Sequence, residues 1–169
     1  MERANAFDFI GPKTLVGPEL KVGQQAPAFV LLGQDLKDVE STRFAGKPYI
    51  LSVMPSVDTG VCDLQTKRFN EEAGKLGDRV AVVTVSADLP FALRRYCGAN
   101  DITNLVVTSD HRTMAFGAAY GTYIKEVRLE SRAVFVVDKA GVLRYVEYVP
   151  VAGQHPNYDA ALAVLQTLI

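Results

Sequence analysis

The hydrophobic residues of this chain alternate between short continuous runs and segments in which they recur every three or four positions. Continuous runs of roughly four to eight apolar residues are typical of buried strands, whereas the wider spacing places apolar side chains along one face of a helix. The runs predict core strands over residues 49–54, 80–87, 105–108, 133–138 and 142–148. The spaced pattern predicts helices over residues 60–76, 89–96, about 112–119 and 158–168.

This alternation of strands with helices indicates parallel strands joined by helical crossovers, which is the signature of an α/β layer fold. The last two strands are an exception. The segment between them, Asp138-Lys-Ala-Gly141, is too short for a crossover and is rich in turn-forming residues. We therefore expect these two strands to be antiparallel neighbours within a mixed sheet.

Composition favours one compact unit without a general affinity for polyanions. The chain has 169 residues, of which 49% are apolar, so we expect a single domain over residues 1–169 with one core. Its formal net charge of −1 offers no general attraction to nucleic acid or anionic lipid. No segment approaches the roughly 18 consecutive apolar residues of a membrane span, and no apolar signal run begins the sequence. We expect a cytoplasmic protein with neither nucleic acid nor membrane as a partner.

Cys62 lies where a predicted strand gives way to a predicted helix. Pro55 closes the strand, because proline cannot continue a central ladder. Cys62 then falls in the first turn of the helix over residues 60–76, where backbone N–H groups lack intrahelical partners and carry the positive end of the helix dipole. That position favours the thiolate, which is the nucleophilic form of cysteine. Thr59 can direct its hydroxyl at the sulfur or at an oxygen bound beside it.

Each of these residues also has an ordinary structural interpretation. Thr59 suits the N-cap of the helix, and most unpaired cysteines are small buried hydrophobic residues. Two cysteines in a chain of this length are too few for a disulfide scaffold, which favours redox chemistry or simple burial.

Cys97 occupies the opposite kind of position. Asp88 is a good N-cap residue and Pro90 suits a first helical turn, so we expect a helix that begins there and ends at Cys97 with Gly98 as its αL cap. A cysteine at a helix C-terminus faces carbonyl groups and the negative end of the dipole, which disfavours its thiolate. Cys97 therefore suits a thiol that waits for a reactive partner, or a buried filler.

Five segments, taken together, resemble one enzyme family. In chain order they are Pro55-x-x-x-Thr59-x-x-Cys62, Ser86-Ala-Asp-Leu-Pro-Phe-Ala92, Cys97-Gly98, Arg132-Ala-Val-Phe-Val-Val-Asp138 and Asn157-Tyr-Asp-Ala-Ala-Leu162. Their order resembles that of the bacterial thiol peroxidases, the atypical two-cysteine branch of the peroxiredoxins. The resemblance implies a thioredoxin-like fold with a central mixed sheet flanked by helices. It also implies an N-terminal β-hairpin extension over residues 1–22, formed by residues 7–16.

The resemblance further implies a thiol-dependent peroxidase that reduces hydrogen peroxide and organic hydroperoxides. Cys62 would become a sulfenic acid and condense with Cys97 to an intramolecular disulfide. Pro55, Thr59 and Arg132 would bind the peroxide, with the Arg132 guanidinium donating to both the sulfur and the peroxide. Thioredoxin is the implied reductant, and a homodimer is the implied assembly.

Geometry adds one expectation about the disulfide. Bridging requires two Cα atoms to lie within about 7 Å, which two rigid helix ends do not readily satisfy. We therefore expect the first turn around Cys62, the helix end at Cys97, or both to unwind before the bond forms. Because the chain has no Cys-x-x-Cys pair, an external dithiol must reduce the disulfide.

Two acidic residues affect this interpretation. The family usually has apolar residues before its arginine, whereas this chain has Glu130 and Ser131. In a continuous strand Glu130 would share a face with Arg132, where an ion pair could divert or orient the guanidinium. We expect Asp63, in contrast, to be a solvated carboxylate at the start of its helix.

Other functions for these residues have less support. His111 and His155 do not fall at the paired spacings of a structural zinc site with the two cysteines, and neither has the sequence context of a cysteine hydrolase base. We expect no metal and no cofactor. A non-enzymatic peroxide sensor or a thioredoxin-fold binding module is the alternative function, and catalytic turnover with a reductant distinguishes the two.

Overall fold

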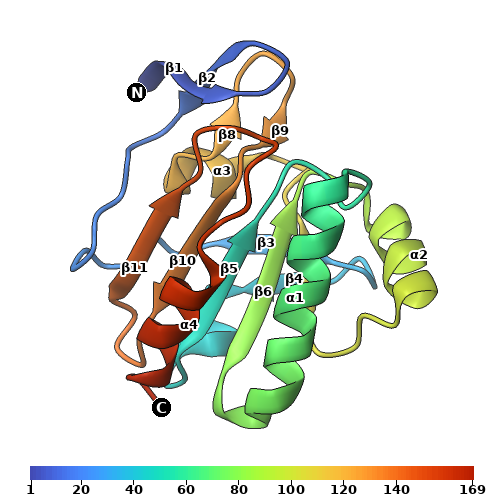
Figure 1. Ribbon diagram of the computed structural model, residues 1–169, viewed down its shortest axis with the longest axis vertical. Coiled ribbons are helices and arrows are strands. Elements are labelled where there is room, and N and C mark those ends of the chain that lie inside the picture. Colours follow the sequence, from blue (N-terminus) through green and yellow to red (C-terminus); the bar gives the residue numbers. More distant parts are fainter.

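A seven-stranded mixed sheet forms the centre of the protein, whose computed structural model describes residues 1–169 (Figure 1). The strand order is β11-β10-β5-β6-β7-β3-β4. The strands are β3 (Val30–Gly33), β4 (Asp38–Glu40), β5 (Tyr49–Val53), β6 (Ala81–Ser86), β7 (Val106–Ser109), β10 (Ala133–Val137) and β11 (Leu143–Tyr148). The helices are α1 (Gly60–Leu76), α2 (Pro90–Asn100), α3 (Ala115–Tyr120) and α4 (Tyr158–Gln166), with short 3-10 helices η1 (Ser41–Phe44) and η2 (Gly77–Arg79).

The pairing of the strands confirms the predicted mixed α/β sheet. Strands β5, β6 and β7 are parallel, and α1 and α2 form the crossovers between them. Strand β10 is antiparallel to both β5 and β11. The predicted turn joins β10 to β11: Asp138 Oδ1 accepts hydrogen bonds from the backbone N–H of Ala140 and Val142, and Gly141 adopts a φ of 81°.

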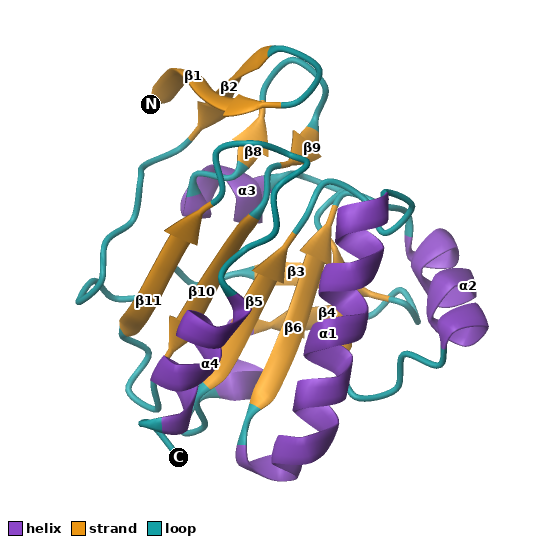
Figure 2. Cartoon of the chain, in the orientation of Figure 1, coloured by secondary structure: helices purple, strands orange, loops and turns teal.

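Helices cover both faces of this sheet, so its central strands are buried on both sides. Figure 2 shows α1 and α4 in front of the sheet and α3 behind it. Alternate residues of one strand enter different cores: Val134 and Val136 pack with α1 and α4, whereas Phe135 packs with α3. Two buried faces explain why these strands read as continuous apolar runs.

A second, four-stranded sheet lies above one end of the first (Figure 1), in the order β1-β2-β8-β9. Strands β1 (Glu2–Asp8) and β2 (Pro12–Val16) form an N-terminal hairpin at the place where the resemblance implies one. Strands β8 (Tyr123–Ile124) and β9 (Leu129–Glu130) complete the sheet. The hairpin is also tied to the loop after β11, because Asp8 exchanges backbone hydrogen bonds with Pro150 and Ala152.

The structure corrects two element ends. Helix α2 continues to Asn100, so Cys97 and Gly98 lie inside it, and Asp101 provides the left-handed residue at its end with a φ of 55°. Helix α3 begins at Ala115 and not at residue 112, because Met114 is itself left-handed with a φ of 56°. The edge strands β3 and β4 were not predicted, since each is at most four residues long. None of the helices has the length and apolar character needed to cross a membrane.

Candidate active site

The fold places Cys62 in the first turn of α1, directly after the strand-to-helix loop. Strand β5 ends at Val53, and Pro55 opens the loop that leads to Thr59, the extended residue before the helix. The side chain of Cys62 is completely buried, and both cysteines are free thiols. The predicted position of Cys62, at the positive end of a helix dipole, is therefore confirmed.

Thr59 occupies the N-cap position, but its hydroxyl does not cap the helix. The Thr59 hydroxyl donates to the backbone carbonyl of Ser56 at 3.3 Å, and Thr59 lines a cavity that Arg132 also lines. The lone pairs of this hydroxyl are not used by the helix, so they can accept a hydrogen bond from a bound peroxide.

Arg132 is the only cation that contacts either sulfur, and it is 1% exposed. Its Nη2 donates to the sulfur of Cys62 at 3.3 Å and to the carbonyl of Ala152 at 2.8 Å. Its Nη1 donates to Gln65 Oε1 at 2.8 Å, and its Nε donates to the Ala152 carbonyl at 3.2 Å. Partners on three sides fix the guanidinium plane, which is the rigid donor geometry that arginine offers.

Gln65 was missed by the sequence analysis. It lies one turn after Cys62 and is fully buried on the inner face of α1. Its amide group joins two elements: Oε1 accepts from Arg132, while Nε2 donates to Ser52 Oγ of β5 at 2.8 Å. A glutamine on the apolar face of a helix was the available signal, because buried polar side chains are retained where they have partners.

Asp88 holds the loop before α1, and it does not cap α2 as predicted. Its Oδ1 accepts from Ser56 Oγ at 2.7 Å, and its Oδ2 accepts from the Val57 N–H at 3.0 Å and from Ser86 Oγ at 2.8 Å. Leu89 stands at the N-cap position of α2 instead. The carboxylate thus links β6 to the loop that carries Thr59, and it fixes the entrance to the cysteine helix.

Glu130 does not pair with Arg132. It is fully buried and accepts a hydrogen bond from the hydroxyl of Thr122. Burial, together with the neighbouring carboxyl of Asp110, raises the pKa of Glu130 well above its ordinary value. Asp110 itself accepts from the backbone N–H groups of α3 at Phe116 and Gly117. The raised pKa favours the neutral, protonated form of Glu130, whose carboxyl group neighbours that of Asp110 near the start of α3.

Cys97 lies in a different environment from that predicted. It is buried in α2 within an apolar cluster that also contains Cys62, Met54, Leu93 and Ile102. Burial raises the pKa of the Cys97 thiol. The sequence also predicts that this thiol resists ionisation, which agrees with the raised pKa. The cause is desolvation of the buried thiol, however, and not the negative end of the helix dipole.

A cavity of about 320 Å³ opens at Arg132, the residue that hydrogen-bonds to the Cys62 sulfur, although Cys62 itself does not line it. The residues that line it are Phe9, Pro55, Thr59, Gly60, Val61, Arg132, Ala152 and Gly153. Three of the predicted peroxide-binding residues, Pro55, Thr59 and Arg132, therefore share one cavity. Phe9 comes from the N-terminal hairpin, whose tip reaches this cavity through its ties to the loop after β11.

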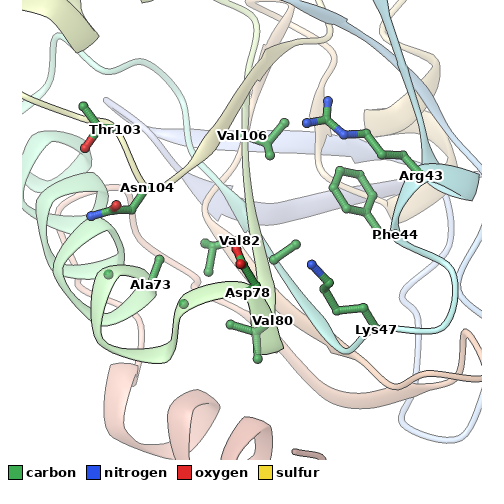
Figure 3. Close-up of a pocket in the computed structure, with 13 residues that line it drawn as sticks. Arg43, Phe44, Lys47, Ala73, Asp78, Val80, Val82, Thr103, Asn104 and Val106 are labelled. Carbon is green, nitrogen blue, oxygen red and sulfur yellow. The ribbon is translucent and has the colours of Figure 1, made fainter.

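A second cavity, of about 350 Å³, lies elsewhere, at the far end of α1. Figure 3 shows Arg43 and Lys47 on one side of it and Asn104 on the other. No cysteine lines this cavity, so it offers no thiol for peroxide chemistry. No group of three or more His, Cys, Asp and Glu side chains is placed to hold a metal ion. His155 is exposed and hydrogen-bonds to the Tyr158 hydroxyl, and it makes no hydrogen bond to either sulfur.

Comparison with known proteins identifies the family to which the chain belongs. The redoxin family model matches residues 21–162. The thiol peroxidase of Bacillus subtilis is 55% identical over 159 residues, which are 94% of this chain and 95% of that protein. A thiol peroxidase of Listeria monocytogenes is 50% identical over 151 residues, covering 89% of this chain and 91% of the relative.

Solved structures show the same fold. The crystal structure of a peroxiredoxin-like protein from Aquifex aeolicus superposes with a TM-score of 0.87 at 39% identity, covering 94% of each chain. A thiol peroxidase from Chromobacterium violaceum, 23% identical, has a TM-score of 0.82 over 92% of this chain and 91% of that one. These likenesses confirm the predicted thioredoxin-like fold. The chain therefore belongs to the redoxin family and, within it, to the thiol peroxidases, the thiol-dependent peroxidases that its motifs predict.

Proposed function

We propose that this protein reduces peroxides through a two-cysteine cycle in which Cys62 is the nucleophile and Cys97 resolves the product. The observation that carries this proposal is the contact of 3.3 Å between the buried Cys62 sulfur and the guanidinium of Arg132, a residue that also lines an open cavity. A cation held at a thiol favours the thiolate and presents a donor to an oxygen that binds beside it.

In the first step, the Cys62 thiolate attacks the nearer peroxide oxygen in line with the O–O bond. The S–O bond forms as the O–O bond breaks, and the departing oxygen gathers negative charge before it takes up a proton. Arg132 is already oriented by Gln65 and Ala152, so it can stabilise this charge without rearranging. Thr59 adds a hydroxyl, and Pro55 shields the sulfur from water.

In the second step, the Cys97 thiol condenses with the Cys62 sulfenic acid. An S–S bond forms, the S–O bond breaks, and the hydroxyl leaves with the Cys97 proton as water. Both cysteines lie in one apolar cluster, which supports their pairing. Each is held in a helix, α1 or α2, so we infer that part of these helices unwinds before the bond forms.

In the third step, an external dithiol reduces the disulfide, and thioredoxin is the reductant that the family resemblance implies. The cavity supports organic hydroperoxides as substrates besides hydrogen peroxide, because Phe9, Val61 and Ala152 give it an apolar lining for an alkyl group. The homodimer and the cytoplasmic location stay predictions, which rest on the resemblance and on composition respectively.

A coupled assay tests the proposal. Purified protein is mixed with thioredoxin, thioredoxin reductase and NADPH, and NADPH oxidation is followed with hydrogen peroxide and with cumene hydroperoxide. We expect many turnovers with both peroxides, and none with the Cys62→Ser variant. Oxidation of the protein by one equivalent of peroxide without turnover would favour the peroxide sensor instead. A Cys62 that peroxide does not oxidise would contradict both the peroxidase and the sensor.

A further inference from the structure

One side-chain hydrogen bond joins the two cysteine helices. The hydroxyl of Tyr96, on α2, donates to Oδ1 of Asp63, on α1, at 2.6 Å. Asp63 directly follows Cys62 in the sequence, and Tyr96 directly precedes Cys97. The link therefore connects the two residues adjacent to the thiols, on the two segments whose movement the disulfide requires.

The surroundings make this a charge-assisted hydrogen bond. Tyr96 is 8% exposed, and its ring packs in the apolar cluster that contains both cysteines. Burial alone would raise the pKa of Asp63, but hydrogen bonds from Tyr96 and from Lys67 hold that pKa below its ordinary value. Asp63 is thus a carboxylate at neutral pH and not the freely solvated group predicted from the sequence. Hydrogen bonds to an ionised acceptor are the stronger kind.

We propose that the Tyr96–Asp63 hydrogen bond is a latch that holds the cysteine helices in the folded, peroxide-reactive arrangement and slows formation of the Cys62–Cys97 disulfide. This inference rests on the proposed two-cysteine cycle. The latch depends on helical backbone at both Asp63 and Tyr96. A disulfide needs its Cα atoms within about 7 Å, so unwinding at either cysteine separates the two latch residues.

The latch sets a choice between two fates of the Cys62 sulfenic acid. After opening, Cys97 displaces the hydroxyl and water leaves, as in the second step of the cycle. While the latch is closed, a second peroxide can transfer an oxygen to the same sulfur, giving Cys62 sulfinic acid and releasing an alcohol or water. Tyr96 is therefore a positioning residue that makes the enzyme more sensitive to inactivation at high peroxide.

The test compares Tyr96→Phe with Tyr145→Phe. Both substitutions remove a hydroxyl that donates to a carboxylate, but the Tyr145 hydroxyl bonds to Glu147 on β11, away from the thiols. Reduced protein is mixed with peroxide, quenched with acid at intervals and analysed by mass spectrometry for sulfenic acid, disulfide and sulfinic acid. A hydrogen bond to a charged, partly exposed group supports an expected effect of about tenfold.

We expect Tyr96→Phe to form the disulfide about tenfold faster and to yield correspondingly less sulfinic acid, with Cys62 oxidised at the wild-type rate. Tyr145→Phe should match the wild type in all three products. Disulfide formation at the wild-type rate in Tyr96→Phe would overturn the latch. A wild-type protein that turns peroxide over without a Cys62–Cys97 disulfide would overturn the proposed cycle, and the latch with it.

Asp63→Asn provides a second route to the same conclusion if Tyr96→Phe folds poorly. The neutral amide weakens the acceptor, so we expect faster disulfide formation, by a smaller factor than in Tyr96→Phe. In the double variant, Asp63→Asn should add nothing to Tyr96→Phe, because the two residues act through one hydrogen bond. Independent, additive effects would show that the residues act separately and would contradict the latch.

Discussion

The two cysteines are both buried, yet different forces hold them in place. Cys62 contacts a polar network in which Arg132, Gln65 and Ser52 satisfy one another across three elements. Cys97 is surrounded by apolar side chains, and beside it a single partly exposed hydrogen bond links its helix to α1. One region is fixed by directional bonds, and the other by packing.

This difference suits the two chemical tasks. A buried polar network is costly to disturb, because a member that loses its partner is left desolvated. The site that meets peroxide is therefore preorganised, with its donor already pointing at the sulfur. Apolar packing has no such directional requirement, so the end of α2 can move at lower cost. The reactive thiol is held by several directional bonds, while the resolving thiol is held by packing and by one nearby hydrogen bond, so its segment can move at lower cost.

The largest expected effect comes from removing each thiol. Cys62→Ser should abolish peroxide reduction, because the nucleophile is lost. Cys97→Ser should consume one equivalent of peroxide per chain and then stall as sulfenic acid, or as sulfinic acid after a second equivalent, under thioredoxin recycling, since its sulfenic acid has no intramolecular thiol to attack it. Mass spectrometry after peroxide treatment measures both products. A Cys97→Ser protein that stays fully reduced would reverse the assignment of the two thiols.

The second prediction concerns the cation on the Cys62 side. Loss of a donor that stabilises developing oxyanion charge costs on the order of a hundred- to a thousandfold in rate. Arg132→Met should slow Cys62 oxidation by about that factor, and Arg94→Met, which removes an exposed arginine on α2, should leave the rate within about twofold. Quenched-flow mixing with peroxide, followed by alkylation of the Cys62 that is still reduced, measures the rate of this step. Equal losses in both variants would show that Arg132 has no special electrostatic role.

Much of this contrast could be predicted from local sequence. The strand-to-helix change at Pro55 placed Cys62 in a first helical turn, because apolar spacing and proline position are local signals. Selecting Arg132 among the 18 Lys and Arg residues was different, since nothing local distinguishes it. That choice came from the family resemblance, and the structure supplies its physical basis in a contact between α1 and Arg132, the residue just before β10.

Contacts between distant elements account for the wrong predictions. The prediction that Glu130 and Arg132 share a face assumed one continuous strand. In the structure, β9 ends at Glu130 and β10 begins only at Ala133. Arg132 belongs to neither strand, so the rule for side chains within one strand does not apply to this pair: Glu130 bonds to Thr122 and Arg132 contacts Cys62. Asp88 met the local rule for an N-cap, but two hydroxyls and an N–H from other segments bind it instead. Tertiary partners of this kind outweigh a local preference.

A third prediction asks whether the end of α2 around Cys97 unwinds more readily than the first turn of α1 around Cys62. In the disulfide form, amide hydrogens of residues 91–100 should exchange about tenfold faster than in the reduced form, and those of residues 60–69 should be affected to a smaller extent. The reason is that local unwinding breaks the helical hydrogen bonds that protect these amides. Strand β10 should stay protected in both forms. Exchange followed by mass spectrometry measures all three segments. Identical exchange in both redox states would mean that the thiols already lie at bonding distance and that no helix unwinds.

The smallest expected effect tests whether the buried carboxyl group of Glu130 lowers the free energy of unfolding as the pH rises. Glu130 lies two residues before Arg132, and its pKa is raised by burial and by Asp110. The folded state therefore keeps a proton that the unfolded state has lost once the pH exceeds the ordinary carboxyl value of about 4.5. The stability from this group is complete below that pH, and it declines by up to about 1.4 kcal/mol per unit as the pH rises toward the raised folded pKa.

Glu130→Gln removes this decline, because an amide does not ionise but still accepts from Thr122 and can donate to Asp110. The variant and the wild type should therefore have similar free energies of unfolding at pH 4.5, and the variant should become progressively the more stable as the pH rises to 8. Denaturant titrations at both pH values measure this difference, with the exposed Glu40→Gln as the matched control, which should show no such divergence. If the difference in free energy of unfolding between variant and wild type stays constant across this range, Glu130 is ionised in the folded protein and its pKa is not raised.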